Sequence, residues 1–150
     1  MPLSSINIYT LKQYRVSRVR YDLELKVTSP SVCHHLLNLL LDLHHEPVEK
    51  FGIISLNTKY KITGLHVLAV GSLESVTVEP REVFKAAMIN NAFAILAFHN
   101  HPSGDPEASA ADIALTKRLK KVGEILNIKL IDHLIIAEGK WFSMKEAKLI

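Results

Sequence analysis

The pattern of hydrophobic and polar positions predicts a chain in which strands and helices alternate. Residues 18–27 alternate strictly between apolar and charged side chains, which predicts a strand with one buried and one solvent-facing side, near a sheet edge. The nearly continuous apolar runs 51–56 and 94–98 predict strands that are covered on both faces. Further strands are predicted at 61–71, 129–137 and 141–142.

Helical spacing of apolar residues, together with end signals, predicts the helices between these strands. Pro30 and Pro80 suit the first helical position, and Ser109 is a candidate N-cap. The predicted helices cover residues 30–44, 80–90 and 109–127, and a capped helical turn covers 143–149. Interleaved strands and helices with one hairpin predict an α/β sheet with helices packed against it. We therefore expect one domain over residues 29–150, preceded by an N-terminal arm and edge strand in residues 1–28.

Composition narrows the class of protein without deciding its chemistry. A length of 150 residues, with 48% hydrophobic and 22% charged residues, is typical of one globular domain. The net charge of +3 is far from that of a dedicated nucleic-acid binder, and we interpret the cluster 117–121 as the solvated side of a helix. No apolar run approaches the ~20 residues of a membrane span. The single Cys33 excludes an internal disulfide, and we expect a cytoplasmic location.

The candidate chemistry lies between His99 and Asp112. Side chains two apart on a strand share a face, so His99 and His101 at the end of the 94–98 strand aim two imidazoles at one point. The turn residues 102–106 then form a loop, and Asp112 follows on the first turn of the next helix. Two imidazoles and one carboxylate, with a position left for water, are the ligands of a catalytic zinc site.

Each part of this pattern has a simpler interpretation. Ser109-Ala-Ala-Asp112 also matches a capping box, which needs no metal, and a His-x-His pair alone is a weak signal. The two interpretations of Asp112 are compatible, because a capped helix can still present a ligand. We interpret His34, His35, His44 and His45 as surface or interface residues, since adjacent histidines on a helix cannot face one ion.

The string His99-Asn-His-Pro-Ser-Gly-Asp-Pro106, followed by Ser109-x-x-Asp112, resembles the metal motif of JAMM/MPN metallopeptidases and specifically of their RadC branch. Segments 79–84 and 132–136 also match, so the resemblance covers roughly residues 31–150. It implies a JAMM/MPN-like (cytidine-deaminase-like) mixed sheet that binds one zinc ion. It further implies His99, His101 and Asp112 as metal ligands and Ser109 as the serine that stabilises the oxyanion. The glutamate that serves such sites as general base falls on Glu49.

This resemblance leads us to expect a zinc-dependent hydrolase that cleaves a peptide or isopeptide bond in a peptide or protein substrate. Asp105 and the loop carbonyls are candidate acceptors for the outer ring nitrogens of the metal-binding histidines. His133 is a further candidate, and the alternative for it is a structural hydrogen bond beneath the sheet. A nucleoside deaminase is excluded, because it needs a Pro-Cys-x-x-Cys segment that the chain lacks. The alternative is a non-catalytic, metal-containing binding module of a DNA repair or DNA-processing complex. The sequence leaves the substrate, nucleic-acid contact and homo-oligomer formation open, and predicts no membrane association.

Overall fold

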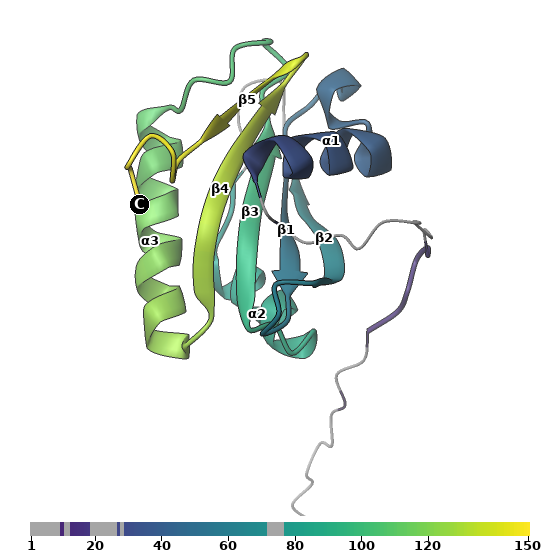
Figure 1. Ribbon diagram of the computed structural model, residues 1–150, viewed down its shortest axis with the longest axis vertical. Coiled ribbons are helices and arrows are strands. Elements are labelled where there is room, and N and C mark those ends of the chain that lie inside the picture. The colour runs from purple at the N-terminus through teal and green to yellow at the C-terminus, as the bar shows by residue number, and fades with distance from the viewer. Residues whose placement is uncertain (1–9, 11–12, 19–26, 28, 72–76) are drawn as a thin grey trace, which may run out of the picture.

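The computed structural model describes residues 10, 13–18, 27, 29–71 and 77–150. Most of the predicted arm and of the predicted 18–27 strand therefore lies outside the described residues. The described part folds as one α/β unit (Figure 1). In chain order its elements are α1 (Pro30–Leu41), the 3-10 turn η1 (Leu43–His45), β1 (Lys50–Leu56), β2 (Ile62–Val70), α2 (Pro80–Ile89), β3 (Ala94–Asn100), α3 (Ala110–Leu126), β4 (Lys129–Ala137) and β5 (Lys140–Ser143).

The strands of the described residues form one mixed sheet in the order β2-β1-β3-β4-β5. β1 is antiparallel to both β2 and β3, β3 and β4 are parallel, and β5 returns antiparallel to β4. A parallel pair needs a crossover connection, and α3 supplies it between β3 and β4. The predicted fold class, a mixed sheet packed with helices, is confirmed.

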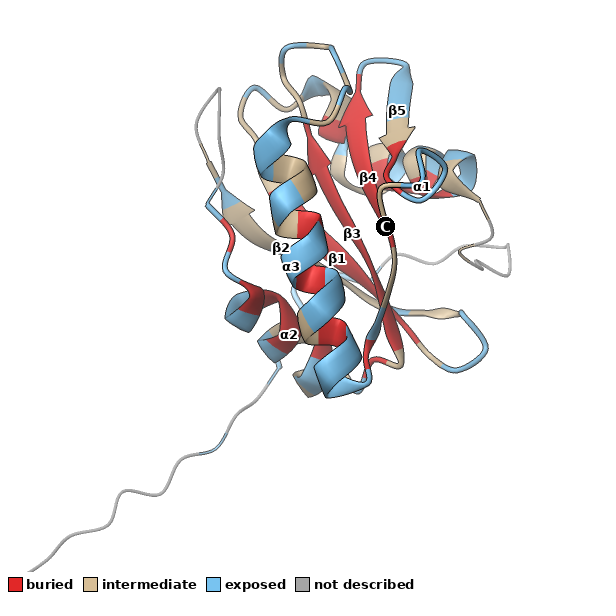
Figure 2. Cartoon of the chain, turned by 90° about the vertical axis from the view of Figure 1, so that its left-hand side faces the viewer, coloured by how far each residue is buried: buried red, intermediate tan, exposed pale blue. Residues whose placement is uncertain are grey.

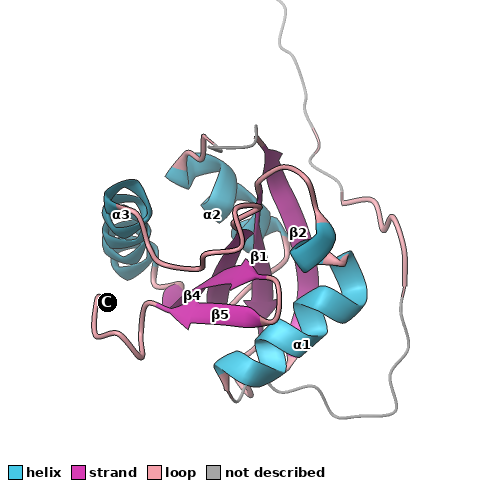
Figure 3. Ribbon diagram, turned by 90° about the horizontal axis from the view of Figure 1, so that it is seen from above, coloured by secondary structure: helices cyan, strands magenta, loops and turns pink. Residues whose placement is uncertain are grey.

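The two faces of the sheet are covered by different helices, α1 on one side and α2 with α3 on the other (Figure 3). β3 is buried along its whole length between these layers (Figure 2). Leu96 and Phe98 pack in the core under α1, whereas Ile95 and Ala97 pack in the core under α2 and α3. Because side chains alternate along a strand, His99 lies on the same face as Ile95 and Ala97 and faces the layer that contains α3.

The first predicted helix ends earlier than its sequence pattern, whereas the predicted capped turn near the end of the chain is present. The first helix was predicted to reach His44, but α1 ends at Leu41, because Asp42 adopts a left-handed conformation (φ 51°) and the chain continues as the 3-10 turn η1. After β5 the predicted capped turn is present as a single turn. There Ala147 N–H donates to Ser143 O and Glu146 N–H donates to Ser143 Oγ. None of the helices in the described residues is long and apolar enough to span a membrane.

Candidate metal centre

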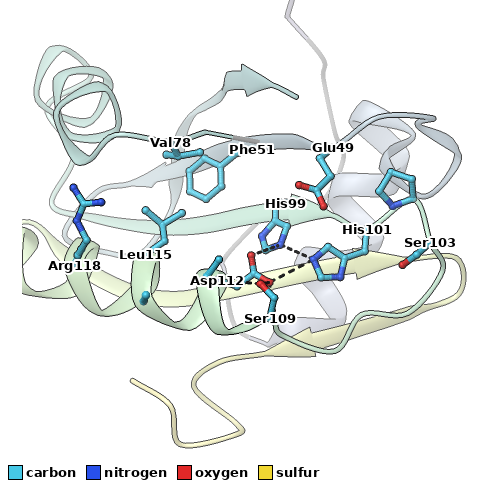
Figure 4. Close-up of a pocket in the computed structure, with 13 residues that line it drawn as sticks. Glu49, Phe51, Val78, His99, His101, Ser103, Ser109, Asp112, Leu115 and Arg118 are labelled. Atoms are coloured by element: carbon cyan, nitrogen blue, oxygen red, sulfur yellow. Dashed lines mark hydrogen bonds and ion pairs between the residues drawn. The ribbon is translucent and has the colours of Figure 1, made fainter. Parts of the chain in front are cut away.

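The carboxyl end of β3 and the first turn of α3 bring His99, His101 and Asp112 together (Figure 4). The two histidine Nε2 atoms lie 3.0 Å apart. His99 Nε2 lies 3.2 Å from Asp112 Oδ1, and His101 Nε2 lies 3.5 Å from Asp112 Oδ2. Four ligands at zinc distances of about 2.0–2.2 Å in a tetrahedron are about 3.3–3.6 Å from one another. The spacing between the two imidazole nitrogens and the Asp112 carboxylate therefore fits one zinc ion.

The helix cap and the ligand position of Asp112 coexist, as the sequence allowed. Ser109 Oγ accepts a hydrogen bond from Asp112 N–H at 3.1 Å, and Ser109 N–H donates to Asp112 Oδ2 at 2.8 Å, which together form a capping box. Ser109 Oγ also donates to Asp112 Oδ2 at 2.6 Å. The cap thus fixes the carboxylate that faces the histidines.

A buried chain of hydrogen bonds determines which nitrogen of His99 carries its proton. Thr116 Oγ1 donates its single proton to the backbone oxygen of Asp112 at 2.6 Å. The Thr116 hydroxyl oxygen can then only accept from His133 Nδ1, which also lies at 2.6 Å. His133 Nε2 must then accept, and His99 Nδ1 donates to it at 2.8 Å. His99 Nε2 is left with a lone pair that points at the other two ligand atoms. His133 was predicted as a candidate acceptor for an outer ring nitrogen, and this contact is confirmed.

The loop after β3 fixes His101 in the same way. His101 Nδ1 lies 2.8 Å from the Asp105 carbonyl oxygen, which can only accept, so Nδ1 donates and Nε2 keeps its lone pair. Gly104 has a left-handed φ of 84°, which lets the loop turn back so that this carbonyl reaches the ring. Two lone pairs and a carboxylate now face one point, an arrangement that is repulsive unless a cation lies between them.

The charges around this point favour a cation there. The neighbouring carboxylate of Asp112 raises the pKa of His101 despite the opposing effect of burial. Burial would raise the pKa of Asp112, but its close contacts with His101 and His99 outweigh burial and hold that pKa well below its usual range. Burial, together with the charge of His99, lowers the pKa of His133 well below its usual value and keeps that ring neutral. The group therefore attracts a proton or a metal ion, and its donor set suits zinc.

Glu49 lies beside these residues at the start of β1. β1 and β3 pair antiparallel with Phe51 opposite His99 at the end of the ladder. Glu49 precedes β1 by one residue and His101 follows β3 by one residue, so the same register, continued by two residues, would bring them opposite each other. The Glu49 carboxylate points toward the histidines (Figure 4), and its charge contributes to the raised pKa of His101. The register thus brings Glu49 to the candidate centre, although its role as general base stays a prediction.

Asn100 holds the segment that carries Glu49. Its side chain is 1% exposed and lies on the opposite face of β3 from the histidines. Asn100 Oδ1 accepts from Lys50 N–H at 2.7 Å, and Asn100 Nδ2 donates to the Val48 carbonyl at 3.1 Å. These two bonds fix the backbone on both sides of Glu49.

The candidate centre opens into a cavity of about 580 Å³, within the size range of small-molecule sites. Glu49, Ser109 and the three candidate ligands line one part of it. Phe51, Val78 and Leu115 form an apolar part, and Arg118 lies at its far end (Figure 4). A polar group with potential ligands therefore borders an apolar space large enough for part of a peptide.

A second group of possible ligands, Asp42, His44 and His45, lies at η1. These three side chains come together because the α-helix ends at Leu41 and the chain continues through Asp42 into a 3-10 turn. The argument that adjacent histidines on an α-helix cannot face one ion therefore does not apply to them. His45 Nδ1 bonds Asp42 Oδ1 at 2.9 Å, and the Asp42 side chain is 66% exposed. A hydrogen bond at the protein surface accounts for this group.

Two polar residues of the centre were not predicted from the sequence. Thr116 sits one helical turn after Asp112, but its partner His133 is 17 residues further along the chain. Asn100 stood between the two histidines without an assigned role, and its partners precede it by about 50 residues. Both residue types are ordinary in these positions, so only the long-range packing identifies them.

Comparisons with known proteins agree with this geometry. Residues 27–149 match the model of the family described as RadC-like JAB domain. The chain is 46% identical over 121 residues to a UPF0758 protein of Caldanaerobacter subterraneus, an alignment that covers 80% of this chain and 51% of that protein. It is 48% identical over 113 residues to a UPF0758 protein of Moorella thermoacetica, covering 75% and 49% of the two chains.

A UPF0758 protein of Desulfitobacterium hafniense is 36% identical over 165 residues, with 99% of this chain and 73% of that protein covered. The chain spans about half the length of the Caldanaerobacter and Moorella relatives. The activity, substrates and partners of the whole relatives are therefore separate questions from the chemistry of this centre.

Proposed function

The chain belongs to the RadC-like JAB domain family, and from this premise we propose that it is a zinc-dependent hydrolase that cleaves a peptide or isopeptide bond. JAB domains are often metal-dependent hydrolases. The finding that carries the proposal is the convergence of two imidazole lone pairs and one carboxylate at the mouth of a cavity, with Glu49 beside them. A site that only stores metal needs no carboxylate such as Glu49 next to the ligands.

The residues of the chain divide the work of hydrolysis as follows. A zinc ion held by His99, His101 and Asp112 would supply a Lewis acid that activates water near neutral pH. Glu49 accepts one proton from the attacking water as its oxygen bonds to the carbonyl carbon. Glu49 then gives this proton to the leaving amine as the carbon–nitrogen bond breaks.

Ser109 is the proposed donor to the oxyanion. Its hydroxyl proton is directed at Asp112 Oδ2, so the hydroxyl must rotate to reach a developing negative charge on the substrate. Its oxygen is already fixed by the helix cap, which keeps the reorganisation small. Ser109 thus has two proposed tasks, orienting a ligand in the resting protein and stabilising the oxyanion during reaction.

The test is hydrolysis of peptide and isopeptide libraries by the zinc-loaded protein and by Glu49→Gln, with product masses as the readout. General acid–base catalysis contributes about 10²–10⁴-fold, so Glu49→Gln should lose at least about a hundredfold in rate while keeping its zinc. Glu107→Gln is the matched control, because Glu107 is an exposed acid of the adjoining loop. It should behave like the wild type.

The alternative, a non-catalytic binding module, makes the opposite prediction. If that alternative is correct, no library member is cleaved and Glu49→Gln changes neither zinc content nor any binding. Cleavage that survives in Glu49→Gln would also contradict the proposal, because another group would then be moving the proton. A peptide or protein substrate remains part of the proposal, while nucleic-acid contact, homo-oligomer formation and cytoplasmic location stay predictions.

A further inference from the structure

The cavity continues from the candidate metal centre along α3. Ser109, Asp112, Leu115 and Arg118 follow one another at steps of three residues, and all four line it. Each step of three residues falls about 60° short of a full helical turn, so the row winds gradually along α3 and presents a cap, a candidate ligand, an apolar side chain and a cation in sequence. Figure 4 shows the row running from the histidines to Arg118.

The middle of the cavity is apolar on both sides. Phe51 of β1 and Val78 lie across from Leu115 of α3 (Figure 4). Phe51 is 1% exposed, and its ring lies against His99 with 6.3 Å between ring centroids, so this wall is fixed directly beside a candidate ligand. A substrate side chain placed here would have to be apolar, because a polar one would lose its hydration without gaining a partner.

At the far end of the cavity, Arg118 forms an ion pair with Glu79. Arg118 Nη2 of α3 lies 3.3 Å from Glu79 Oε2, just before α2. The two side chains are 59% and 58% exposed, so the pair is weak and a competing carboxylate can replace Glu79. A guanidinium also binds a carboxylate with two parallel hydrogen bonds, which makes Arg118 a selective end point.

We propose that this cavity selects a peptide with apolar side chains next to the scissile bond and a carboxylate two to three residues away from it, bound by Arg118. The proposal rests on the hydrolase function proposed above. Six residues separate Asp112 from Arg118, an axial distance of about 9 Å in an α-helix. An extended peptide covers this distance in two to three residues at about 3.3–3.6 Å each. The carboxylate belongs to an Asp or Glu side chain or to the free end of the peptide.

The experiment uses peptide hydroxamates, whose hydroxamate group binds zinc and fixes the register without any turnover. One probe carries two leucines and then an aspartate with an amidated end, and its twin carries asparagine in place of aspartate. A third probe has leucines only and ends in a free carboxylate at the same distance, which separates a side-chain from a terminal carboxylate. The aspartate and asparagine probes are made in both chain directions, and the free-carboxylate probe carries its hydroxamate at the amino end. The Kd of each probe for the zinc-loaded protein is measured by calorimetry.

The aspartate or free-carboxylate probe should bind about fivefold more tightly than the asparagine probe in one chain direction. This is the gain in affinity expected from one exposed ion pair. Arg118→Gln should abolish this preference. Glu79→Gln should increase it, because Arg118 loses a competing partner; an ion pair with only a structural role would not produce this gain. Lys117→Gln is the matched control on the exposed side of α3 and should leave the preference unchanged.

Equal binding of the three probes in both directions would overturn the inference, and so would a preference that persists in Arg118→Gln. If no hydroxamate binds and the protein holds no zinc, the metal centre itself fails, and this inference fails with it. If the preference is found but no peptide is cleaved, the acidic-peptide pocket stands and the proposed hydrolysis is wrong. The outcomes of the two proposals are therefore distinguishable.

Discussion

Thr116→Val should weaken zinc binding although Thr116 is not a ligand. Thr116 is fully buried, and its hydroxyl makes two hydrogen bonds of 2.6 Å, donating to Asp112 O and accepting from His133 Nδ1. Valine keeps the shape of the side chain but provides no acceptor. His133 is 0% exposed, so water cannot replace the lost partner.

The magnitude follows from the proton positions. With Nδ1 unpaired, His133 has a buried donor without a partner, which costs about 1–3 kcal/mol. His133 escapes this cost by moving its proton to Nε2. His99 must then accept at Nδ1 and carry its own proton on Nε2, the nitrogen proposed to bind the metal. The zinc-free protein relaxes in this way, so the cost appears when zinc binds. We expect zinc affinity to fall about 10- to 100-fold, equivalent to about 1.4–2.8 kcal/mol.

The assay is competition for zinc between the protein and a chromophoric chelator at neutral pH. Ser55→Ala is the matched control, because Ser55 Oγ is also a buried hydroxyl but makes no hydrogen bond among the described residues. It should bind zinc like the wild type. If Thr116→Val binds zinc within about twofold of the wild type, the chain from Thr116 through His133 does not set the state of His99, and our argument for the metal position is refuted.

Three further predictions test other parts of the structure. Asn100→Ala should slow hydrolysis with the zinc content unchanged, because the backbone around Glu49 loses two hydrogen bonds; an unchanged rate would show that Asn100 does not position Glu49. Gly52→Ala should lower the free energy of unfolding in urea by at least about 1–3 kcal/mol, since its Cβ would lie 2.3 Å from His66 O and 2.4 Å from Phe98 Cζ; an unaffected midpoint would contradict this packing. Burial lowers the pKa of His66, so the unfolded chain takes up a proton there before the folded one, and stability falls as the pH decreases below about 6.5. His66→Gln should lose less stability than the wild type between pH 7.5 and 5.5, and equal losses would show that His66 does not contribute.

Local rules account for the parts of the structure that the sequence predicted correctly. The alternation of β3 placed His99 and His101 on one face, and the Ser-x-x-Asp pattern placed Ser109 and Asp112 on the first turn of α3. These predictions depend on spacings of two or three residues, which the backbone geometry fixes. Glu49 came only from a family resemblance, and the register of β1 against β3 now gives a physical reason for its place.

Long-range pairing and local backbone choices account for the remainder. Thr116 and Asn100 act through partners that are distant in sequence, and no pattern in their neighbourhood marks them. The early end of α1 depends on Asp42 adopting a left-handed conformation, which aspartate tolerates but does not require. The helical spacing before Asp42 continues through His44, so hydrophobic periodicity alone could not place this end.

The most direct test of the account is the zinc content of the purified protein, of Asp112→Ala and of Asp42→Ala, measured by elemental analysis after dialysis against zinc. Asp42→Ala changes the other Asp–His group of the described residues and serves as the matched control. We predict about one zinc ion per chain in the wild type and in Asp42→Ala, and none in Asp112→Ala. Absence of zinc from the wild type, or its retention in Asp112→Ala with loss in Asp42→Ala, would contradict the central claim that His99, His101 and Asp112 form the metal centre.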